Sequence, residues 1–196
     1  MTLKGQVMYK SNYKKEALLT VINAAKNNDI AALEELIRRV QKDVFTMFTY
    51  LTQNRQDVSD LTQDALLRMA KNIKNLHEIK SFKSWLNHIV TNIFNDYVKQ
   101  NHRVLPKEAD TKAIFEIRDK INCEPGEKCI FSEMEKLVRW ALLTLPHNLR
   151  IVIVLREYEG MSYEDIAKIT KTSLGTVKSR ISRARNKLQN ELRDFI

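Results

Sequence analysis

Residues 162–188 have the sequence SYEDIAKITKTSLGTVKSRISRARNKL, and their pattern predicts two helices separated by a tight turn. Ser162 followed three residues later by Asp165 is typical of a capped helix N-terminus, which predicts a short helix over residues 163–169. Residues 170–173 fit a tight turn before a second, longer helix. A short helix, a brief turn and a longer helix together predict a helix-turn-helix.

The longer helix has one apolar stripe and one cationic face. Either Thr172 or Ser173 can cap its first turn. Four apolar residues at helical spacing form a narrow stripe that we expect to be buried: Val177, Ile181, Ala184 and Leu188. Residues 178–187 carry five positive charges and no acid, whereas an ordinary solvated helix face interleaves both signs.

This cationic face has the composition of a DNA-reading surface. Small polar residues lie at its centre, namely Ser179, Ser182 and Asn186. They let a helix approach base edges in the major groove. The long cations on both flanks can reach the phosphates of the two groove walls. We therefore predict that the final helix contacts DNA.

The composition of the whole chain predicts an all-α fold and a polyanionic partner. The chain has 196 residues, 43% of them hydrophobic, with only 4 glycines and 3 prolines. Strands and tight hairpins usually need more turn residues than this. Basic residues number 33 against 24 acidic ones, a formal net charge of +9. A basic balance of this size suits nucleic acid.

Helical periodicity continues over most of the remaining chain. Helices are predicted over residues 13–27, from an N-cap at Asp29 to Phe48, from near Asp57 or Ser59, and over residues 82–100. Residues 104–131 break the pattern with two prolines and a glycine, which predicts a linker. The predicted organisation is therefore two small helical domains, residues 1–103 and 132–196, joined by a flexible linker over residues 104–131.

A further helix is predicted ahead of the helix-turn-helix. Pro146 occupies a position that the first turn of a helix tolerates. Gly160 can end this helix in a left-handed cap. Four residues are expected to point inward from it: Leu149, Val152, Ile153 and Leu155.

Two helices of the first half also have distinct faces. Asp60, Gln63 and Asp64 share one face, which gives an acidic and amide surface for a basic or polar partner helix. The helix over residues 82–100 groups apolar side chains on one side and Trp85 with amides and charges on the other. An aromatic among amides and cations suits unstacked single-stranded bases. Phe82 and Trp85 fit the core equally well.

Two stretches of the second half resemble a known family. Residues 163–167 (YEDIA) and 173–185 (SLGTVKSRISRAR) are similar to the promoter-binding fourth region of sigma-70-family factors, above all the extracytoplasmic-function (ECF) branch. In that family this helix reads the −35 promoter element. The resemblance implies −35 contacts by Ser173, Thr176, Lys178, Ser179, Arg180, Ser182, Arg183, Arg185 and Lys187.

Two stretches of the first half resemble the second region of the same family. Residues 57–68 (DVSDLTQDALLR) are similar to the part that binds core RNA polymerase, which implies contacts by Asp57, Asp60, Leu61, Gln63 and Asp64. Residues 81–96 (SFKSWLNHIVTNIFND) are similar to the segment that melts and reads the −10 element. They imply −10 contacts by Phe82, Trp85, Asn92, Asp96, Lys99 and Arg103. The implied partners are core RNA polymerase and promoter DNA, and the resemblance allows an anti-sigma factor as well.

Two other functions are open to a chain with a helix-turn-helix. A stand-alone transcription regulator would bind DNA as a dimer, and it would need a dimerisation surface or a receiver domain. A DNA-processing recombinase would need a clustered nucleophile or metal-binding carboxylates. The sequence contains no pattern for either. We therefore favour a sigma factor that is not an enzyme.

The cysteines and the hydropathy of the chain indicate a cytoplasmic protein without a cofactor. Cys123 and Cys129 are too few for a disulfide framework. They also lack the second Cys or His pair of a zinc site, so we expect two free thiols and no metal. No apolar run approaches the roughly 20 residues that span a bilayer. Residues 1–15 lack the apolar segment of a secretory signal, so no membrane partner is expected.

Overall fold

The computed structural model of the protein describes residues 17–101 and 133–193, and all regular elements within these ranges are helical. The predicted all-α fold is therefore confirmed. The predicted linker over residues 104–131, with Cys123 and Cys129, lies outside the described residues, as do residues 1–16 and Arg103. No described helix is both long enough and apolar enough to cross a membrane.

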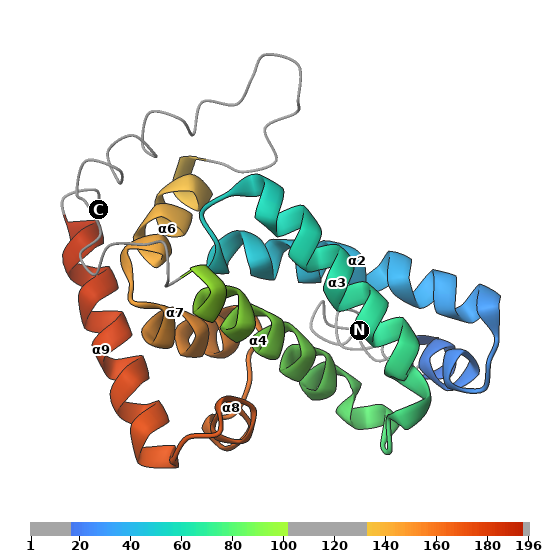
Figure 1. Ribbon diagram of the computed structural model, residues 1–196. Coiled ribbons are helices and arrows are strands. Elements are labelled where there is room, and N and C mark those ends of the chain that lie inside the picture. The colour runs from blue at the N-terminus through green and yellow to red at the C-terminus, as the bar shows by residue number, and fades with distance from the viewer. Residues whose placement is uncertain (1–16, 102–132, 194–196) are drawn as a thin grey trace, which may run out of the picture.

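Residues 17–101 form the N-terminal module (Figure 1). A helix covers residues 17–26 and leads into α2 (Ile30–Leu51). The predicted N-cap of α2 is confirmed, because the Asp29 carboxylate accepts a hydrogen bond from the Ala32 amide at 3.0 Å. Four further elements follow in order: α3 (Arg55–Asn72), η1 (Ile73–Asn75), η2 (Ile79–Ser81) and α4 (Phe82–Asn101).

The start of α3 differs from the prediction. The helix begins at Arg55, before Asp57 and Ser59. The cause is local, since the Asn54 side chain accepts a hydrogen bond from the Gln56 amide at 3.0 Å and acts as the N-cap. The predicted apolar face of α4 is confirmed by the burial of Leu86, Val90, Ile93 and Phe94.

Residues 133–193 form the C-terminal module. Its elements are α6 (Glu133–Thr144), α7 (His147–Ile153), η3 (Val154–Tyr158), α8 (Tyr163–Thr170) and α9 (Leu174–Leu192). The four residues predicted to point inward ahead of the helix-turn-helix are all buried. α7 continues into η3, which is a π-helical turn. Gly160 then turns the chain with a φ of 66°, the left-handed conformation that the sequence predicted.

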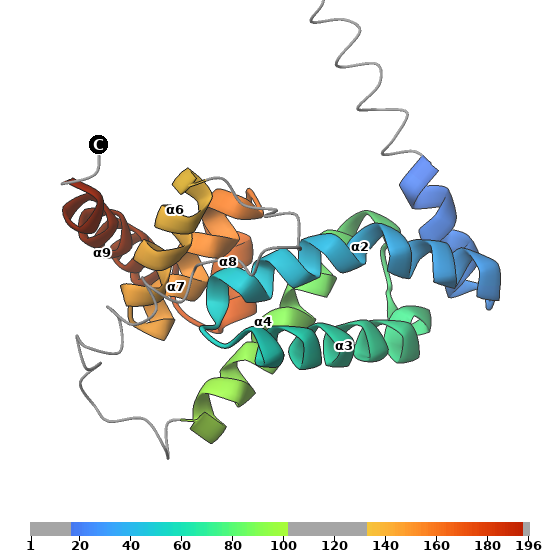
Figure 2. The ribbon, with the colours of Figure 1, turned by 90° about the horizontal axis from the view of Figure 1, so that it is seen from above.

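The two modules pack against one another (Figures 1 and 2). α2 contacts α6, α7 and η3, while α4 contacts α8. Buried apolar side chains of both modules belong to one continuous cluster. α9 lies on the side of the C-terminal module that faces away from the N-terminal module (Figures 1 and 2). The sequence predicted the two helical units but not their packing against each other.

Candidate nucleic-acid interface

Two serine caps and one left-handed residue shape the helix-turn-helix. The Ser162 hydroxyl accepts a hydrogen bond from the Asp165 amide at 3.0 Å and starts α8. Lys171 ends α8 with a φ of 52°, and its amide donates to the carbonyls of the last turn. Of the two predicted caps of the final helix, the structure uses Ser173, whose hydroxyl accepts from the Thr176 amide at 3.1 Å.

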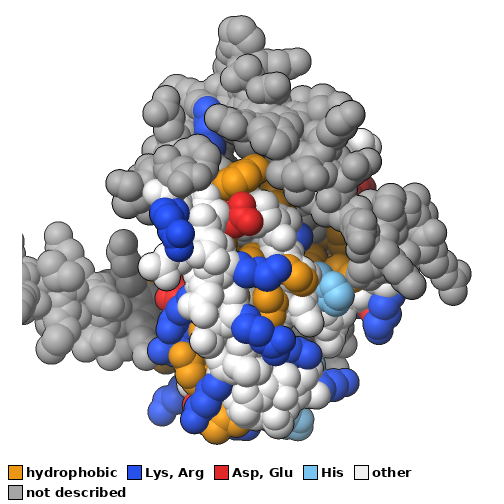
Figure 3. Space-filling model, turned by 90° about the vertical axis from the view of Figure 1, so that its left-hand side faces the viewer, with side chains coloured by type: hydrophobic (Ala, Val, Ile, Leu, Met, Phe, Trp, Pro, Cys, Tyr) orange, Lys and Arg blue, Asp and Glu red, His pale blue; other side chains and the backbone are white. Residues whose placement is uncertain are grey.

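Burial divides α9 into the two predicted faces. Val177, Ile181 and Ala184 are buried, and Leu188 is half-buried against the same core. They pack the helix onto α7, α8 and α6. The opposite face is exposed and includes Lys178, Ser179, Ser182, Arg183, Arg185, Asn186 and Lys187. Arg180 and Thr176 are half-buried, and Ser173 is exposed. Figure 3 shows Lys and Arg side chains spread over this side of the molecule.

Two arginines of the exposed face already have partners within the protein. Arg183 lies back along its own helix, where its Nε donates to the Ser179 carbonyl at 3.3 Å. Arg185 forms an ion pair with Glu157 of η3 at 2.6 Å, and this carboxylate raises the pKa of Arg185 above its ordinary value. Both members of the pair are about half exposed, and such pairs contribute little to stability. This ion pair therefore leaves the Arg185 guanidinium accessible to solvent.

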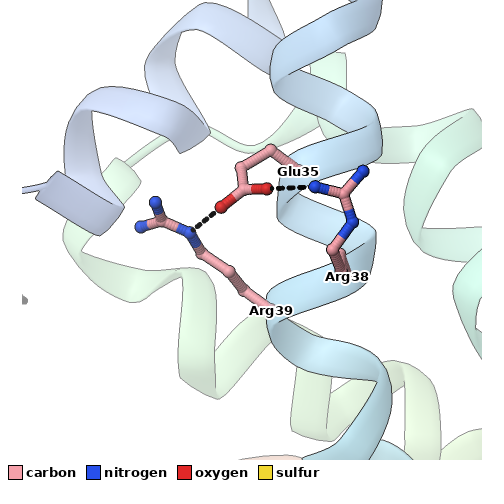
Figure 4. Close-up of polar contacts among 3 residues, drawn as sticks. All are labelled: Glu35, Arg38 and Arg39. Atoms are coloured by element: carbon pink, nitrogen blue, oxygen red, sulfur yellow. Dashed lines mark hydrogen bonds and ion pairs between the residues drawn. The ribbon is translucent and has the colours of Figure 1, made fainter.

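Two exposed arginines of α2 are paired with an acid of their own helix, unlike the arginines of α9. Arg38 and Arg39 each bond to Glu35, at 2.8 and 2.7 Å, so a carboxylate offsets part of their charge (Figure 4). The Arg39 guanidinium, with that of Arg38, holds the pKa of Glu35 below its ordinary value. This cluster is an exposed helix-surface network of one acid and two bases.

A second polar surface lies where α4 meets the end of α3. A cavity of about 240 Å³ is lined there by Arg68, Asn72, Asn75, Trp85, Ile89 and Asn92. Trp85 and Asn92 were predicted from the sequence to contact the −10 element. Asp96 and Lys99 continue the same exposed side of α4 and lie 3.5 Å apart as an ion pair. The cavity thus combines an aromatic wall with amide and guanidinium groups.

Phe82 is not among the residues that line this cavity. Its side chain is 5% exposed and belongs to the hydrophobic core, with its ring 6.0 Å from that of Trp85. Of the two alternatives open for this residue, the structure favours the core. A buried ring supports the position of Trp85 and has no free face for a base.

Sequence analysis did not find Arg68, Asn72 and Asn75 as members of this surface. They lie on α3 and η1, and they meet Trp85 only because α3 packs against α4. The two asparagines at and just after the end of α3, Asn72 and Asn75, were the sequence feature that could have indicated this surface.

The residues predicted to bind core RNA polymerase fall into three groups on α3. Asp60 and Gln63 are exposed, and Asp64 is partly exposed and paired with Arg68 at 2.8 Å. Leu61 is half-buried and packs against the core. Asp57 instead accepts a hydrogen bond from the Tyr97 hydroxyl at 2.7 Å, which ties α3 to α4.

One exposed leucine extends the acidic face of α3. Leu67 is 51% exposed and lies three and four residues after Asp64 and Gln63, on the same side of the helix. Sequence analysis did not include it, because an apolar residue inside an amphipathic helix fits the core pattern equally well. The face formed by Asp60, Gln63, Asp64 and Leu67 is called the α3 face below.

Comparisons with known proteins match both modules to one family. Residues 36–104 match the family described as Sigma-70 region 2, and residues 136–188 match Sigma-70, region 4. The ECF RNA polymerase sigma-E factor of Haemophilus influenzae is 30% identical over 182 residues, which are 90% of this chain and 95% of that protein. The ECF RNA polymerase sigma-E factor of Escherichia coli K12 is 30% identical over 183 residues, covering 90% and 94%.

A solved structure shares the fold as well. The sigma factor RpoE of Bartonella quintana, solved in complex with the anti-sigma factor NepR, superposes with a TM-score of 0.63 at 26% sequence identity. The likeness covers 82% of this chain and 96% of that one. This chain therefore belongs to the ECF family of RNA polymerase sigma factors, which direct RNA polymerase to initiate transcription at promoters.

The hydrogen bond between Asp57 and Tyr97 predicts a structural role for this aspartate. Burial, together with that bond, raises the pKa of Tyr97 well above its ordinary value. We expect Asp57→Ala to lower the free energy of unfolding by about 1.5–3 kcal/mol, the usual contribution of a hydrogen bond to a charged group. The matched control Asp60→Ala removes an exposed carboxylate and should change it by less than about 0.5 kcal/mol. Urea unfolding followed by circular dichroism measures both, and equal effects would rule out this role.

Proposed function

We propose that the N-terminal module binds core RNA polymerase and reads the −10 element, while the C-terminal module reads the −35 element. The domain limits under this proposal are residues 1–103 and 132–196, with residues 104–131 as the linker. One observation carries it: α9 buries a narrow apolar stripe, and residues 178–187 of the same helix carry five cations and no acid. That division is what a helix needs to dock in a major groove.

The centre and the flanks of the exposed face of α9 have different proposed roles in promoter binding. Ser179, Ser182 and Arg183 lie near the centre of the exposed face and are proposed to contact base edges. Arg180, Arg185 and Lys187 lie on its flanks and are proposed to contact phosphates, with Lys178. The hydroxyls of Ser173 and Thr176 pair with each other at 2.8 Å beside the helix N-terminus, where a phosphate would also bind favourably.

The cavity between α3 and α4 is the proposed −10 site. Single-stranded bases bind to proteins by stacking on aromatic rings and by hydrogen bonds to polar groups around them. The cavity offers Trp85 for the first and Asn72, Asn75, Asn92 and Arg68 for the second. We propose that one unpaired base of the opened −10 strand enters it.

The α3 face is the proposed docking surface for core polymerase. It carries carboxylates and an amide for polar or basic groups of the partner, and Leu67 adds apolar area. Protein interfaces commonly combine an apolar centre with a polar rim, and Leu67 with its polar neighbours would supply both. Asp57 and Leu61 support this surface from beneath, through Tyr97 and the core.

The chain acts by recruitment, without catalysis, and works in the cytoplasm where the polymerase is. The relative from Bartonella quintana was solved with an anti-sigma factor, and we extend a partner of that kind to this chain. The alternatives of a stand-alone regulator and of a recombinase lose support, because the family matches cover both modules.

The polymerase surface is tested by charge reversal. We expect Asp60→Arg to weaken binding to purified core RNA polymerase by at least about tenfold, because reversed charges across an interface are costly. The fold should be unaffected, since Asp60 is exposed. Glu34→Arg, an equal reversal on the exposed side of α2, is the matched control and should bind as the wild type does. Equal binding of core by all three proteins would remove the α3 face from the docking site.

Two substitutions in α9 should separate specificity from affinity. Arg183→Ala should cost about 1–3 kcal/mol of binding and relax the preference at one or two base pairs of the −35 site. Lys187→Ala should weaken binding to all sequences alike and reduce the salt slope by about one unit. Binding of the polymerase complex to every single-base variant of the site measures both. If both variants kept the wild-type preference, Arg183 would not be reading bases.

The −10 cavity is tested with single-stranded DNA. Trp85→Ala should lower the affinity for an oligonucleotide of the −10 strand by about 1–3 kcal/mol, the contribution of one stacked base. Asn92→Ala, at an exposed position, should weaken it as well and guards against an effect on folding. Gln100→Ala on the same helix is the control. Fluorescence anisotropy with the polymerase complex measures the affinities, and unchanged binding by Asn92→Ala and Trp85→Ala would exclude the cavity.

A further inference from the structure

One acidic side chain lies beside the exposed cationic face of α9 although it belongs to another element. Glu157 is part of η3, and its carboxylate Oε1 accepts hydrogen bonds from Nε and Nη2 of Arg185 at 3.1 and 2.6 Å. Residues 178–187 themselves carry five cations and no acid. The fold, and not the sequence of the helix, therefore places a carboxylate against this face.

The fold gains little from this ion pair. The side chains of Arg185 and Glu157 are 52% and 54% exposed, and pairs with such exposure contribute little to stability. DNA is a polyanion, so a carboxylate beside a DNA-binding surface lowers the affinity unless it also assists the binding. The position of Glu157 therefore points to a role in DNA binding itself.

The two hydrogen bonds use only one edge of the Arg185 guanidinium. A guanidinium carries five N–H groups in a planar fork, and Nε with Nη2 forms one of its edges. The edge formed by Nη1 and the second N–H of Nη2 can bind a phosphate through two parallel hydrogen bonds. Since about half of the side chain is exposed, Arg185 can hold Glu157 on one edge and a phosphate on the other.

Glu157 lies on a well-anchored part of the C-terminal module. The residue before it, Arg156, donates to the Met161 carbonyl at 2.6 Å, and its guanidinium lies 4.8 Å from the centre of the Tyr163 ring. η3 is a π-helical turn, a rare element that occurs frequently at functional sites. The carboxylate therefore starts from a fixed backbone position from which it can orient Arg185.

We infer that Glu157 is a positioning residue for DNA binding, which orients the Arg185 guanidinium so that its second edge meets a backbone phosphate of the −35 duplex. The inference rests on the proposed function, in which Arg185 contacts a phosphate from the flank of α9. A side chain that is already held in its binding geometry loses less conformational freedom when the DNA binds.

Two effects of the Glu157 carboxylate on DNA binding oppose each other. Immobilising one long side chain at an interface lowers the affinity by about 2- to 13-fold, and an arginine that is oriented beforehand avoids much of this loss. The carboxylate also repels the phosphate. Two anions on opposite sides of one guanidinium lie about 7 Å apart, which in water lowers the affinity by about threefold, and physiological salt reduces this to below about twofold. Positioning is therefore the larger effect.

The test uses the full chain in complex with core RNA polymerase and a fluorescein-labelled promoter duplex that the wild-type complex selects from genomic fragments. Glu157→Ala should bind about three- to fivefold more weakly than the wild type, although it removes a negative charge near DNA. Glu157→Gln keeps an oxygen that accepts from Arg185, and it should bind within about twofold of the wild type. Glu191→Ala, which removes an exposed acid of α9 outside the pair, is the matched control and should leave the affinity unchanged.

A second comparison ties the effect to Arg185. In a chain that already carries Arg185→Ala, adding Glu157→Ala should cause no further loss and up to about a twofold gain, because only the repulsion is left to remove. Thermal unfolding followed by circular dichroism should give the same midpoint for Glu157→Ala and the wild type, since the pair is exposed.

Equal or tighter DNA binding by Glu157→Ala would overturn the inference, because the carboxylate would then only repel DNA. A loss of the same size in the Arg185→Ala chain would also overturn it, since Glu157 would be acting on something other than Arg185. If Arg185→Ala itself bound as the wild type does, the inference would fail while the other contacts of α9 stood. A wild-type complex that preferred no duplex would overturn the proposed function, and the inference with it.

Discussion

Bonds between two arginines and the carbonyl end of α2 join the C-terminal module to the N-terminal module. Arg139 and Arg150 satisfy carbonyls that α2 cannot satisfy itself, and Arg150 also binds carbonyls of its own module. These bonds lie beside the apolar cluster that spans both modules, where α6 and α7 meet α2.

The contact leaves both predicted DNA surfaces open. On α4, Lys83 and Asn87 face Glu159, whereas Trp85 and Asn92 line the cavity shared with α3. On the C-terminal module, α9 lies on the far side and exposes its cations (Figure 3). The packing of the two modules therefore covers neither surface. A tether between two weak binding surfaces increases their joint affinity only when the geometry lets both bind at once.

The sequence predicted the parts of the structure that depend on local patterns. The stripe of Val177, Ile181 and Ala184 is buried as its spacing predicts, and Ser162, Ser173, Asp29 and Gly160 act as the caps and turn that their residue types favour. Such features follow from helix periodicity and from the hydrogen bonds of neighbouring residues.

Contacts between elements that lie far apart in the sequence could not be predicted from local patterns. The cavity residues Arg68, Asn72 and Asn75 come from a different helix than Trp85, and Glu157 reaches Arg185 across 28 positions. The resemblance implied a polymerase contact for Asp57, and only the packing of α3 on α4 reveals its bond to Tyr97. The arginines that cap α2 follow it by about 90 positions, and no local pattern connects them.

The most direct measurement is run-off transcription from genomic DNA fragments with purified core RNA polymerase. We expect that core alone starts without preference, that this chain alone makes no transcript, and that the two together give transcripts of defined length from a small set of fragments. This dependence on both components follows if the chain directs the polymerase to promoters and the core carries out RNA synthesis. Tight binding of the isolated chain to a palindromic site as a dimer, with no promoter-specific transcript when core is added, would contradict the account.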